Sequence, residues 1–359
     1  MSLSATVGNP PQTGQLPADV LPLDVLAPLL VAATGDAAWQ QVDASLITGG
    51  KSNLTFELTC PSGAVILRRP PTGALLATAH DMSREVRVQR ALAGSRVPVA
   101  QILLDDDGAA IGTPFYVMNK VAGHIIRDEL PAGVADTPYA RRQLGYTLVD
   151  VLAELHSVSP SEVGLAEFGR PEGFLARQLR RWGRQWEASR DEPVPALDSL
   201  AQLLEQRLPE SPRPAIVHGD YRLDNCMIAP PSGDAPASVA AVLDWEMSTL
   251  GDPLTDLGML LFYWREAGDP PRLLSPGVTS LEGFPTRREV AQRYAEQTGL
   301  DLEHLWFYEA FAHFKFAVIA QGIQARARAG LMAGQEFGDL QNEVQGIAEQ
   351  GLAIAATHD

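Results

Sequence analysis

Two short segments of this sequence carry residues that could act together on a phosphoryl group. The first, residues 217–225, contains the carboxylate of Asp220, followed five residues later by the amide of Asn225. Nineteen residues after Asn225 comes the carboxylate of Asp244. Metal-assisted phosphoryl transfer needs positioning and charge neutralisation more than covalent chemistry. We therefore interpret Asp220 as the group that orients an attacking hydroxyl, and Asn225 and Asp244 as hard oxygen ligands for Mg²⁺.

Short apolar runs predict the elements that hold these residues. The runs are residues 215–217, 226–228 and 240–243, each suited to a buried strand. Residues 230–236 are rich in Pro and predict the turn between the second and third runs. We expect a hairpin that places Asp220 and Asp244 at the ends of strands, with both carboxylates on the same surface of the site.

The pattern HGDxxxxN at residues 218–225 and the plain aspartate at Asp244 resemble those of the aminoglycoside phosphotransferase and choline kinase branch of the kinase-like folds. Within that branch the chain is similar to the kinase domains associated with acyl-CoA dehydrogenase fusion proteins. The resemblance spans about residues 47–321, through residues 49–55, 67–71, 84–85, 177–178, 182, 251–254 and 319–321. It implies an α+β, bilobal protein-kinase-like fold that uses ATP or another NTP with Mg²⁺.

The N-terminal part reads as the smaller, nucleotide-binding lobe, residues 19–119. The expected elements are strands at 54–58, 64–67, 100–104 and 114–118, and a helix from a capping-box candidate at 78–81 to about residue 93. Strands followed by a helix and two further strands are in the order of the small antiparallel β lobe with one main helix. Residues 23–33 predict a preceding short helix that stops at Gly35, and residues 1–18 predict a mobile tail.

Residues 120–359 predict a larger, mainly helical lobe for catalysis and substrate binding. One of its helices should be capped near Thr137, with Pro138 in its first turn.

Glycines and polar side chains at residues 49–53 predict a loop that lies over nucleotide phosphates. The candidate contacts are Gly50, Lys51, Ser52 and Asn53. A Walker A loop is rejected, because Ser45 stands where its first glycine should be and a strand pattern follows where a helix should begin. The alternative is a plain hairpin turn with a solvated Lys51.

Arg68 stands where related kinases usually place a lysine that contacts phosphate, and the resemblance pairs it with Glu85. Arginine can engage phosphate or carboxylate with two nitrogens, although its reach differs from that of lysine. A purely structural Arg68–Glu85 pair is the alternative, and Arg69 competes in register. Met118 directly precedes the expected hinge at residues 119–123 and Val121 lies within it, where the adenine should lie.

Acceptor contacts are the least determined part of the site. The candidates are Tyr221, Arg222, Glu246, Arg181 and Arg184. The last two belong to an arginine cluster at residues 177–184 that could draw in an anionic substrate, or could be the solvated face of an amphipathic helix. The resemblance gives Asp256 a bracing role behind the catalytic loop, and His218 is interpreted as structural because Asp220 occupies the base position.

These features predict an ATP- and Mg²⁺-dependent phosphotransferase acting on a hydroxyl of a small molecule. The resemblance implies a hydroxyacyl-CoA or hydroxy acid as acceptor and a functional link to an acyl-CoA dehydrogenase. An aminoglycoside or amino-alcohol kinase is the alternative within the enzyme class. A nucleotide-binding regulatory module without turnover is the alternative outside it.

Composition limits the partners. With 44 acidic against 28 basic residues the formal charge is -16, which argues against nonspecific nucleic-acid or anionic-membrane binding. No run approaches the roughly 18 apolar residues of a membrane span. Two cysteines, Cys60 and Cys226, suit a reducing compartment without a disulfide framework, and we expect a cytoplasmic protein. Cys226 is interpreted as a small buried strand residue.

Overall fold

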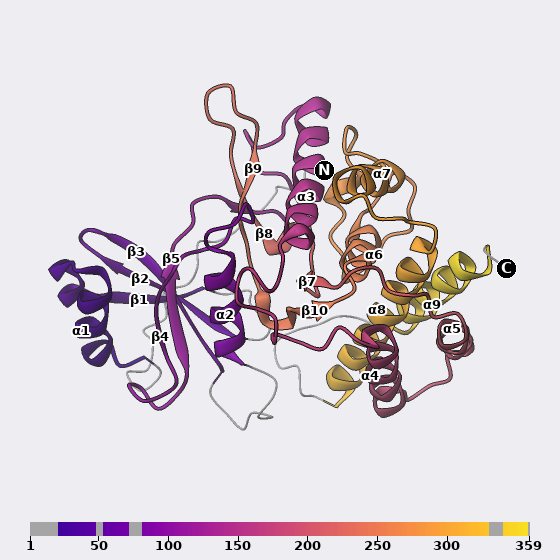
Figure 1. Cartoon of the computed structure of the whole chain (residues 1–359), viewed down its shortest axis with the longest axis horizontal. Coiled ribbons are helices and arrows are strands. Elements are labelled where there is room, and N and C mark those ends of the chain that lie inside the picture. Colours follow the sequence, from indigo (N-terminus) through magenta and orange to yellow (C-terminus); the bar gives the residue numbers. More distant parts are fainter. Residues whose placement is uncertain (1–20, 48–52, 72–80, 330–339, 358–359) are drawn as a thin grey trace, which may run out of the picture. The chain divides into compact units, whose positions relative to one another are not determined.

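The computed structural model describes residues 21–47, 53–71, 81–329 and 340–357 (Figure 1). The predicted tail at 1–18, the loop residues Gly50, Lys51 and Ser52, and the segment 78–80 lie outside the described residues. The chain divides into two compact units. The first comprises residues 1–93, 99–121 and 244–246, and the second comprises residues 94–98, 122–243 and 247–359.

The first unit is built on an antiparallel sheet of strand order β1-β2-β3-β5-β4. Its strands are β1 (Asp43–Ile47), β2 (Leu54–Cys60), β3 (Gly63–Arg69), β4 (Ile102–Asp106) and β5 (Phe115–Asn119). The central strand β3 is apolar at consecutive positions, so both of its faces are buried. Its register places Arg68 opposite Thr55 on β2 and Tyr116 on β5.

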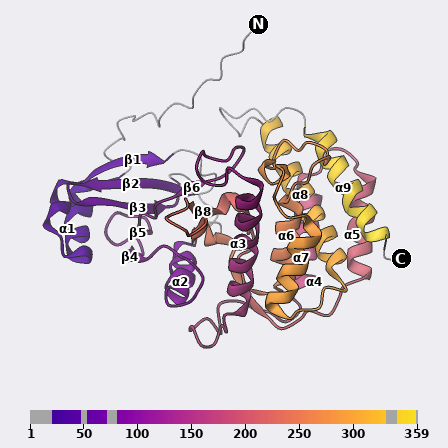
Figure 2. The same cartoon turned by 90° about the horizontal axis from the view of Figure 1, so that it is seen from above.

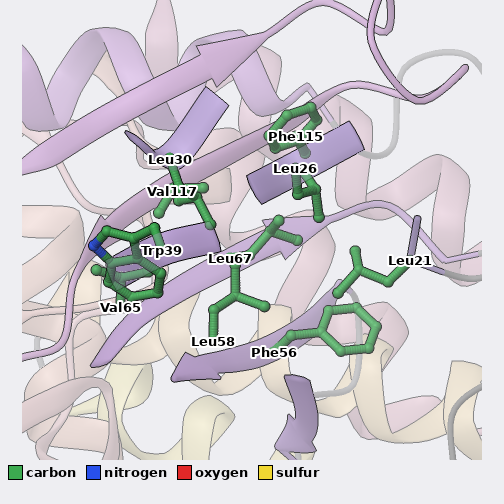
Figure 3. Close-up of a cluster of buried hydrophobic side chains, with 10 residues drawn as sticks. All are labelled: Leu21, Leu26, Leu30, Trp39, Phe56, Leu58, Val65, Leu67, Phe115 and Val117. Carbon is green, nitrogen blue, oxygen red and sulfur yellow. The ribbon is translucent and has the colours of Figure 1, made fainter. Parts of the chain in front are cut away.

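Two helices complete this unit, α1 (Leu23–Thr34) and α2 (Met82–Leu92). One buried cluster joins α1 to the sheet (Figure 3) and comprises Leu21, Leu26, Leu30, Trp39, Phe56, Leu58, Val65, Leu67, Phe115 and Val117. A second cluster joins Met82 and Val86 of α2 to Ile66, Tyr116 and Met118. Because side chains alternate along a strand, the two helices cover opposite faces of the sheet.

The second unit holds two small sheets around the catalytic-loop candidate. β7 (Ala215–Val217) pairs with β10 (Thr249–Gly251), and the other sheet has the order β6-β8-β9. Its strands are β6 (His124–Ile125), β8 (Cys226–Ala229) and β9 (Ser238–Val242), with a register shift between Met227 and Ile228. The predicted hairpin is therefore β8-β9. The pairing of β7 with β10 is not among the predictions, since three-residue strands give little sequence pattern.

Helices make up the rest of this unit. They are α3 (Pro138–Ser157), α4 (Phe174–Ser189), α5 (Pro195–Gln206), α6 (Leu254–Tyr263), α7 (Arg287–Thr298), α8 (Leu305–Arg328) and α9 (Gln341–Ala356). Helix α8 is buried on most sides because α4, α5, α6 and α9 pack around it (Figure 2). It therefore carries polar residues such as Lys315 into the interior.

The predicted fold class is confirmed: an antiparallel sheet lobe is followed by a mainly helical lobe. Helix α3 has the predicted cap, with the Thr137 hydroxyl accepting from Ala140 N–H at 3.1 Å, and α1 ends at Gly35 in a left-handed conformation. The start of α2 differs from the capping-box prediction. Its cap is Asp81, whose carboxylate accepts from Arg84 N–H at 3.2 Å. Within the described ranges, no helix is long and apolar enough to cross a bilayer.

Two helical glycines should respond oppositely to the same substitution. A Cβ at Gly258 on α6 would lie 2.5 Å from Tyr308 O on α8, whereas a Cβ at Gly183 on α4 would meet nothing within 4 Å. We predict that Gly258→Ala lowers the free energy of unfolding by about 1–3 kcal/mol through overpacking. Gly183→Ala should raise it by up to about 1 kcal/mol through helix propensity. Urea unfolding measures both, and equal effects would contradict the close α6–α8 approach.

Candidate active site

The loop after β7 is held by a buried carboxylate on α6. The backbone N–H groups of His218 and Gly219 donate to the two oxygens of Asp256 at 2.6 and 2.8 Å. His156 Nε2 lies 3.2 Å from the same carboxylate. Burial favours the neutral acid, but these partners hold the pKa of Asp256 below its ordinary value. Asp256 is therefore an anion, and in this form it fixes the loop backbone.

Gly219 is required at the start of this loop by both conformation and space. Its φ is +88°, and a Cβ would lie 2.8 Å from the carbonyl oxygen of Met247. The His218 ring is buried, and its Nδ1 accepts from Asp220 N–H at 3.3 Å. Its Nε2 is 2.8 Å from Leu243 O, which assigns the proton to Nε2. His218 thus positions Asp220 and is not itself placed as a base.

Three side chains surround the Asp220 carboxylate. Asn225 Nδ2 donates to Asp220 Oδ2 at 3.0 Å and to the Asp220 backbone oxygen at 2.8 Å. Arg222 Nε lies 3.5 Å from Oδ2, and Tyr263 of α6 is near enough that, after burial, the Asp220 charge also raises the pKa of its hydroxyl. The carboxylate is partly exposed, at 26%. It is thus oriented by donors while it keeps access to a reacting group.

Asn225 ends a short 3-10 turn, Leu223–Asn225, directly before β8. Its amide nitrogen is directed at Asp220, which leaves the amide oxygen as the atom that could coordinate a metal. Its backbone oxygen accepts from Leu243 N–H at 2.8 Å. Leu243 is the residue before Asp244, so the second unit holds the chain on the approach to that carboxylate.

In the first unit, Arg68 bridges two carboxylates. Its Nη1 lies 3.1 Å from Glu85 Oε2, and its Nη2 lies 3.1 Å from Asp244 Oδ1. Burial of the guanidinium opposes its charge, but Tyr116, Glu85 and Asp244 raise the pKa of Arg68 above its ordinary value. The forked guanidinium meets each carboxylate with a separate nitrogen.

Glu85 is fully buried on α2 and accepts three side-chain contacts. Besides Arg68 they are Asn53 Nδ2 at 3.1 Å and Tyr116 Oη at 2.7 Å. Burial raises the pKa of Glu85, and its pairing with Arg68 acts in the opposite direction. Asn53 is thus tied to the Arg68–Glu85 pair. This pair continues to Asp244 and is therefore more than an isolated structural ion pair.

Asp244 has the left-handed backbone that L-residues seldom adopt, with φ +65°. Such strain concentrates at functional sites, and aspartate tolerates it better than most residues. Its side chain is 37% exposed, so one oxygen can pair with Arg68 while the group faces solvent. Across the described residues, no cluster of three or more His, Cys, Asp or Glu could enclose a metal. The Asp244 carboxylate is a hard oxygen donor of the kind that Mg²⁺ prefers, and Mg²⁺ usually keeps waters and phosphate oxygens as further ligands.

The remaining nucleotide candidates lie on the sheet or outside the described residues. Met118 on β5 is buried, and Val121 packs at the edge of the same apolar cluster. Both could therefore face an apolar ring. The other predicted phosphate contacts, Gly50, Lys51 and Ser52, lie outside the described residues.

Three of the predicted acceptor contacts, Tyr221, Arg222 and Glu246, lie in different surroundings. Tyr221 is a correction: it is fully buried and donates its hydroxyl to Leu148 O at 2.8 Å, so it is a core residue. Arg222 contacts Asp220 and Asp224 and stacks on Tyr263, 4.6 Å from the ring centre. Glu246 is half-buried in the 3-10 turn Trp245–Met247.

The arginine cluster on α4 is only partly a solvated face. Arg177 donates to the carbonyl groups of Arg170 and Glu172, so it holds the chain that leads into α4. Arg180 and Arg184 are exposed. Arg181 is also exposed but lines a small pocket together with Lys315.

Two residues of this site carry no signal in the sequence. Tyr263 ends α6 and Lys315 lies in the middle of α8, 43 and 95 residues after Asp220. Lys315 is buried and donates to the backbone oxygen of Gly219 at 2.7 Å. Only their tertiary placement brings them to the catalytic loop.

Comparison with known proteins assigns the chain to a family. The pattern of the phosphotransferase enzyme family, APH, matches residues 43–293. The chain belongs to this family. It is 39% identical over 311 residues to acyl-CoA dehydrogenase family member 11 of Rattus norvegicus, covering 85% of this chain and 39% of the rat protein. This member of the phosphotransferase enzyme family thus spans less than half the length of that curated relative.

Solved structures agree with this membership. A protein from Ralstonia eutropha that has been assigned as an aminoglycoside phosphotransferase matches with a TM-score of 0.80 and 32% identity, over 93% of this chain and 98% of that chain. A thermostable mutant of aminoglycoside phosphotransferase APH(4)-Ia, in a ternary complex with ADP and hygromycin B, matches with a TM-score of 0.59 and 15% identity over 92% and 99%. The second likeness establishes the fold alone.

The hold of Asp256 on the catalytic loop can be tested by replacing it with asparagine. Asp256→Asn keeps the shape but presents one donor group where the two loop N–H groups need acceptors. We predict a loss of about 1–3 kcal/mol in the free energy of unfolding, measured by urea unfolding. The amides of His218 and Gly219 should also exchange faster. Asp234→Asn is the control: it is an exposed change between β8 and β9 and should leave both measurements unchanged. Unchanged stability and unchanged amide exchange in Asp256→Asn would show that Asp256 does not brace the loop.

Proposed function

We propose that this chain is an ATP- and Mg²⁺-dependent phosphotransferase that acts on a hydroxyl group of a small molecule. The observation that carries the proposal is the arrangement around Asp220. The backbone of the two residues before it is fixed by Asp256, and its carboxylate is oriented by Asn225 while remaining partly exposed. A partly exposed, oriented carboxylate is suited to accept a hydrogen bond from an attacking hydroxyl.

The proposed function assigns metal and nucleotide contacts to particular side chains. Asn225 Oδ1 and the Asp244 carboxylate are hard oxygen donors and would coordinate Mg²⁺. The ion, when bound, neutralises charge on the phosphates. Arg68 is positioned by Glu85 to contact phosphate, and Met118 with Val121 would pack against the base. The ADP bound in the APH(4)-Ia structure supports a nucleotide as the phosphoryl donor.

A hydroxyacyl compound is the acceptor class that we favour. Support comes from the relatives' name, acyl-CoA dehydrogenase family member, which points to acyl chemistry in those longer proteins. A functional link to such a dehydrogenase, and a reducing cytoplasmic setting, belong to the same proposal. A screen of hydroxy acids, hydroxyacyl-CoAs, amino alcohols and aminoglycosides for ATP-dependent product phosphorylation tests it. Transfer only to aminoglycosides would overturn the acceptor while leaving the reaction class in place.

Asp220→Asn should impair transfer more than nucleotide binding. The substitution keeps the hydrogen bonds that fix the loop but removes the negative charge that would receive the proton of the attacking hydroxyl. We predict turnover about 10² to 10⁴ times slower, with ATP affinity nearly unchanged, measured by steady-state kinetics and calorimetry. Asp224→Asn provides a neighbouring control and should have a smaller effect, since Asp224 contacts Arg222 and not the acceptor. Loss of ATP binding by folded Asp220→Asn would move Asp220 to a metal role.

Asp244→Ala should weaken the binding of Mg²⁺-ATP. It removes a hard ligand and also releases Arg68 from one of its two carboxylates. We predict that titration calorimetry shows at least about tenfold weaker binding of Mg²⁺-ATP and little change for ATP in EDTA. Asp234→Ala is the matched control on an exposed turn. Equal Mg²⁺-dependence in the wild type and in Asp244→Ala would remove Asp244 from the metal site.

A further inference from the structure

A small pocket in the second unit opens against the first residues of the catalytic loop. Its volume is about 40 Å³, and its lining includes Gly219 of the loop, Lys315 of α8 and Gln178, Arg181 and Trp182 of α4. A water molecule occupies about 30 Å³ in the liquid, so the pocket has room for a group of a few atoms. None of the proposed nucleotide or metal residues lines it.

Lys315 supplies a buried positive charge to this pocket. Its side chain reaches the loop, where Nζ donates to Gly219 O at 2.7 Å and lies 5.6 Å from the centre of the Trp182 ring. An ammonium carries three N–H donors. In the described part of the chain, Gly219 O is the one hydrogen-bond acceptor that Nζ reaches. Two donors are therefore free to meet a ligand.

The charges around Lys315 leave the pocket positive. Asp256 also lines it, but both of its oxygens accept hydrogen bonds from the loop N–H groups. Burial lowers the pKa of Lys315, while Asp220 and Asp256 act in the opposite direction. Arg181 adds a second cation at the rim, and Gln178 adds an amide. A buried cation is stabilised when an anion pairs with it.

We propose that Lys315 and Arg181 form a subsite for an oxyanion of the acceptor, either a carboxylate or a phosphate. The identification of the ligand as the phosphoryl acceptor rests on the proposed function, whereas binding itself needs no phosphoryl transfer. Because Asp220 directly follows Gly219, an acceptor anchored on Lys315 is held beside the group that orients its hydroxyl. The same positive charge disfavours polycationic aminoglycosides and cationic amino alcohols.

Binding can be measured by titration calorimetry on the whole chain without ATP. The first probe is 3-hydroxybutyrate, with 1,3-butanediol as its neutral match. The second probe is 3-hydroxybutyryl-CoA, which carries its anionic groups on the coenzyme. We expect wild-type protein to bind at least one anionic probe and to bind the diol at least about tenfold more weakly. Binding of 3-hydroxybutyrate would identify a carboxylate as the bound oxyanion, and binding of 3-hydroxybutyryl-CoA alone would identify a phosphate.

Lys315→Met keeps the length of the side chain and removes its charge. We expect it to weaken the binding of the anionic probe at least about tenfold. Arg326→Met, on an exposed part of the same helix, should leave that binding unchanged. Because Lys315→Met also breaks the bond to Gly219 and could disturb folding, Arg181→Gln at the exposed rim is the second variant. It should weaken binding several-fold and reduce the dependence on salt concentration.

Absence of binding by either anionic probe to the wild type would overturn the subsite. So would unchanged affinity in both folded Lys315→Met and folded Arg181→Gln. These outcomes differ from failure of the proposed function, which would appear as binding of the anionic probe without any ATP-dependent phosphorylation of the screened acceptors.

Discussion

A buried carboxylate that needs hydrogen-bond donors is the constraint on which the site depends. Asp256 lies in the interior, where an unpaired charge would be costly, and the backbone of the catalytic loop supplies two of its donors. The loop is consequently tied to α6. Helix α6 is in turn held closely against α8 where Gly258 meets Tyr308. The orientation of Asp220 therefore depends on helix packing well away from the loop.

The same packing decides the charge balance around the loop. Asp220 and Asp224 lie close together, and Arg222 contacts both of them. Burial raises the pKa of Asp224, with Arg222 acting in the opposite direction. Lys315 adds a cation from α8 at the Gly219 carbonyl. The loop with its two carboxylates is thus contacted by one cation of its own, Arg222, and by one from a distant helix, Lys315.

A corresponding balance exists in the first unit, where Arg68 joins Glu85 and Asp244. The pair with Glu85 is buried, whereas Asp244 remains partly exposed and has a strained backbone. The two carboxylates therefore differ in surroundings: Glu85 holds the arginine in the interior, whereas solvent reaches Asp244.

The sequence by itself determined the elements and the local chemistry. Alternating and continuous apolar runs predicted β2 to β5 and the two helices of the first unit but not β1, and Pro138 with Thr137 predicted the start of α3, because these signals act between near neighbours in the chain. The spacing of Asp220, Asn225 and Asp244 likewise predicted a phosphoryl-transfer site, and the roles of these residues stay predictions. The family and fold class followed from the resemblance and are confirmed.

Tertiary structure alone decided which side chains meet. Tyr221 is adjacent to Asp220 in the chain, yet it packs into the core, whereas Lys315 lies 95 residues away and reaches the loop. Arg177 and Arg181 look alike in the sequence, but one holds the chain before α4 and the other lines a pocket. Such differences depend on the direction of each side chain and on the helix packed against it. Neither is encoded by local spacing, because long-range packing sets both.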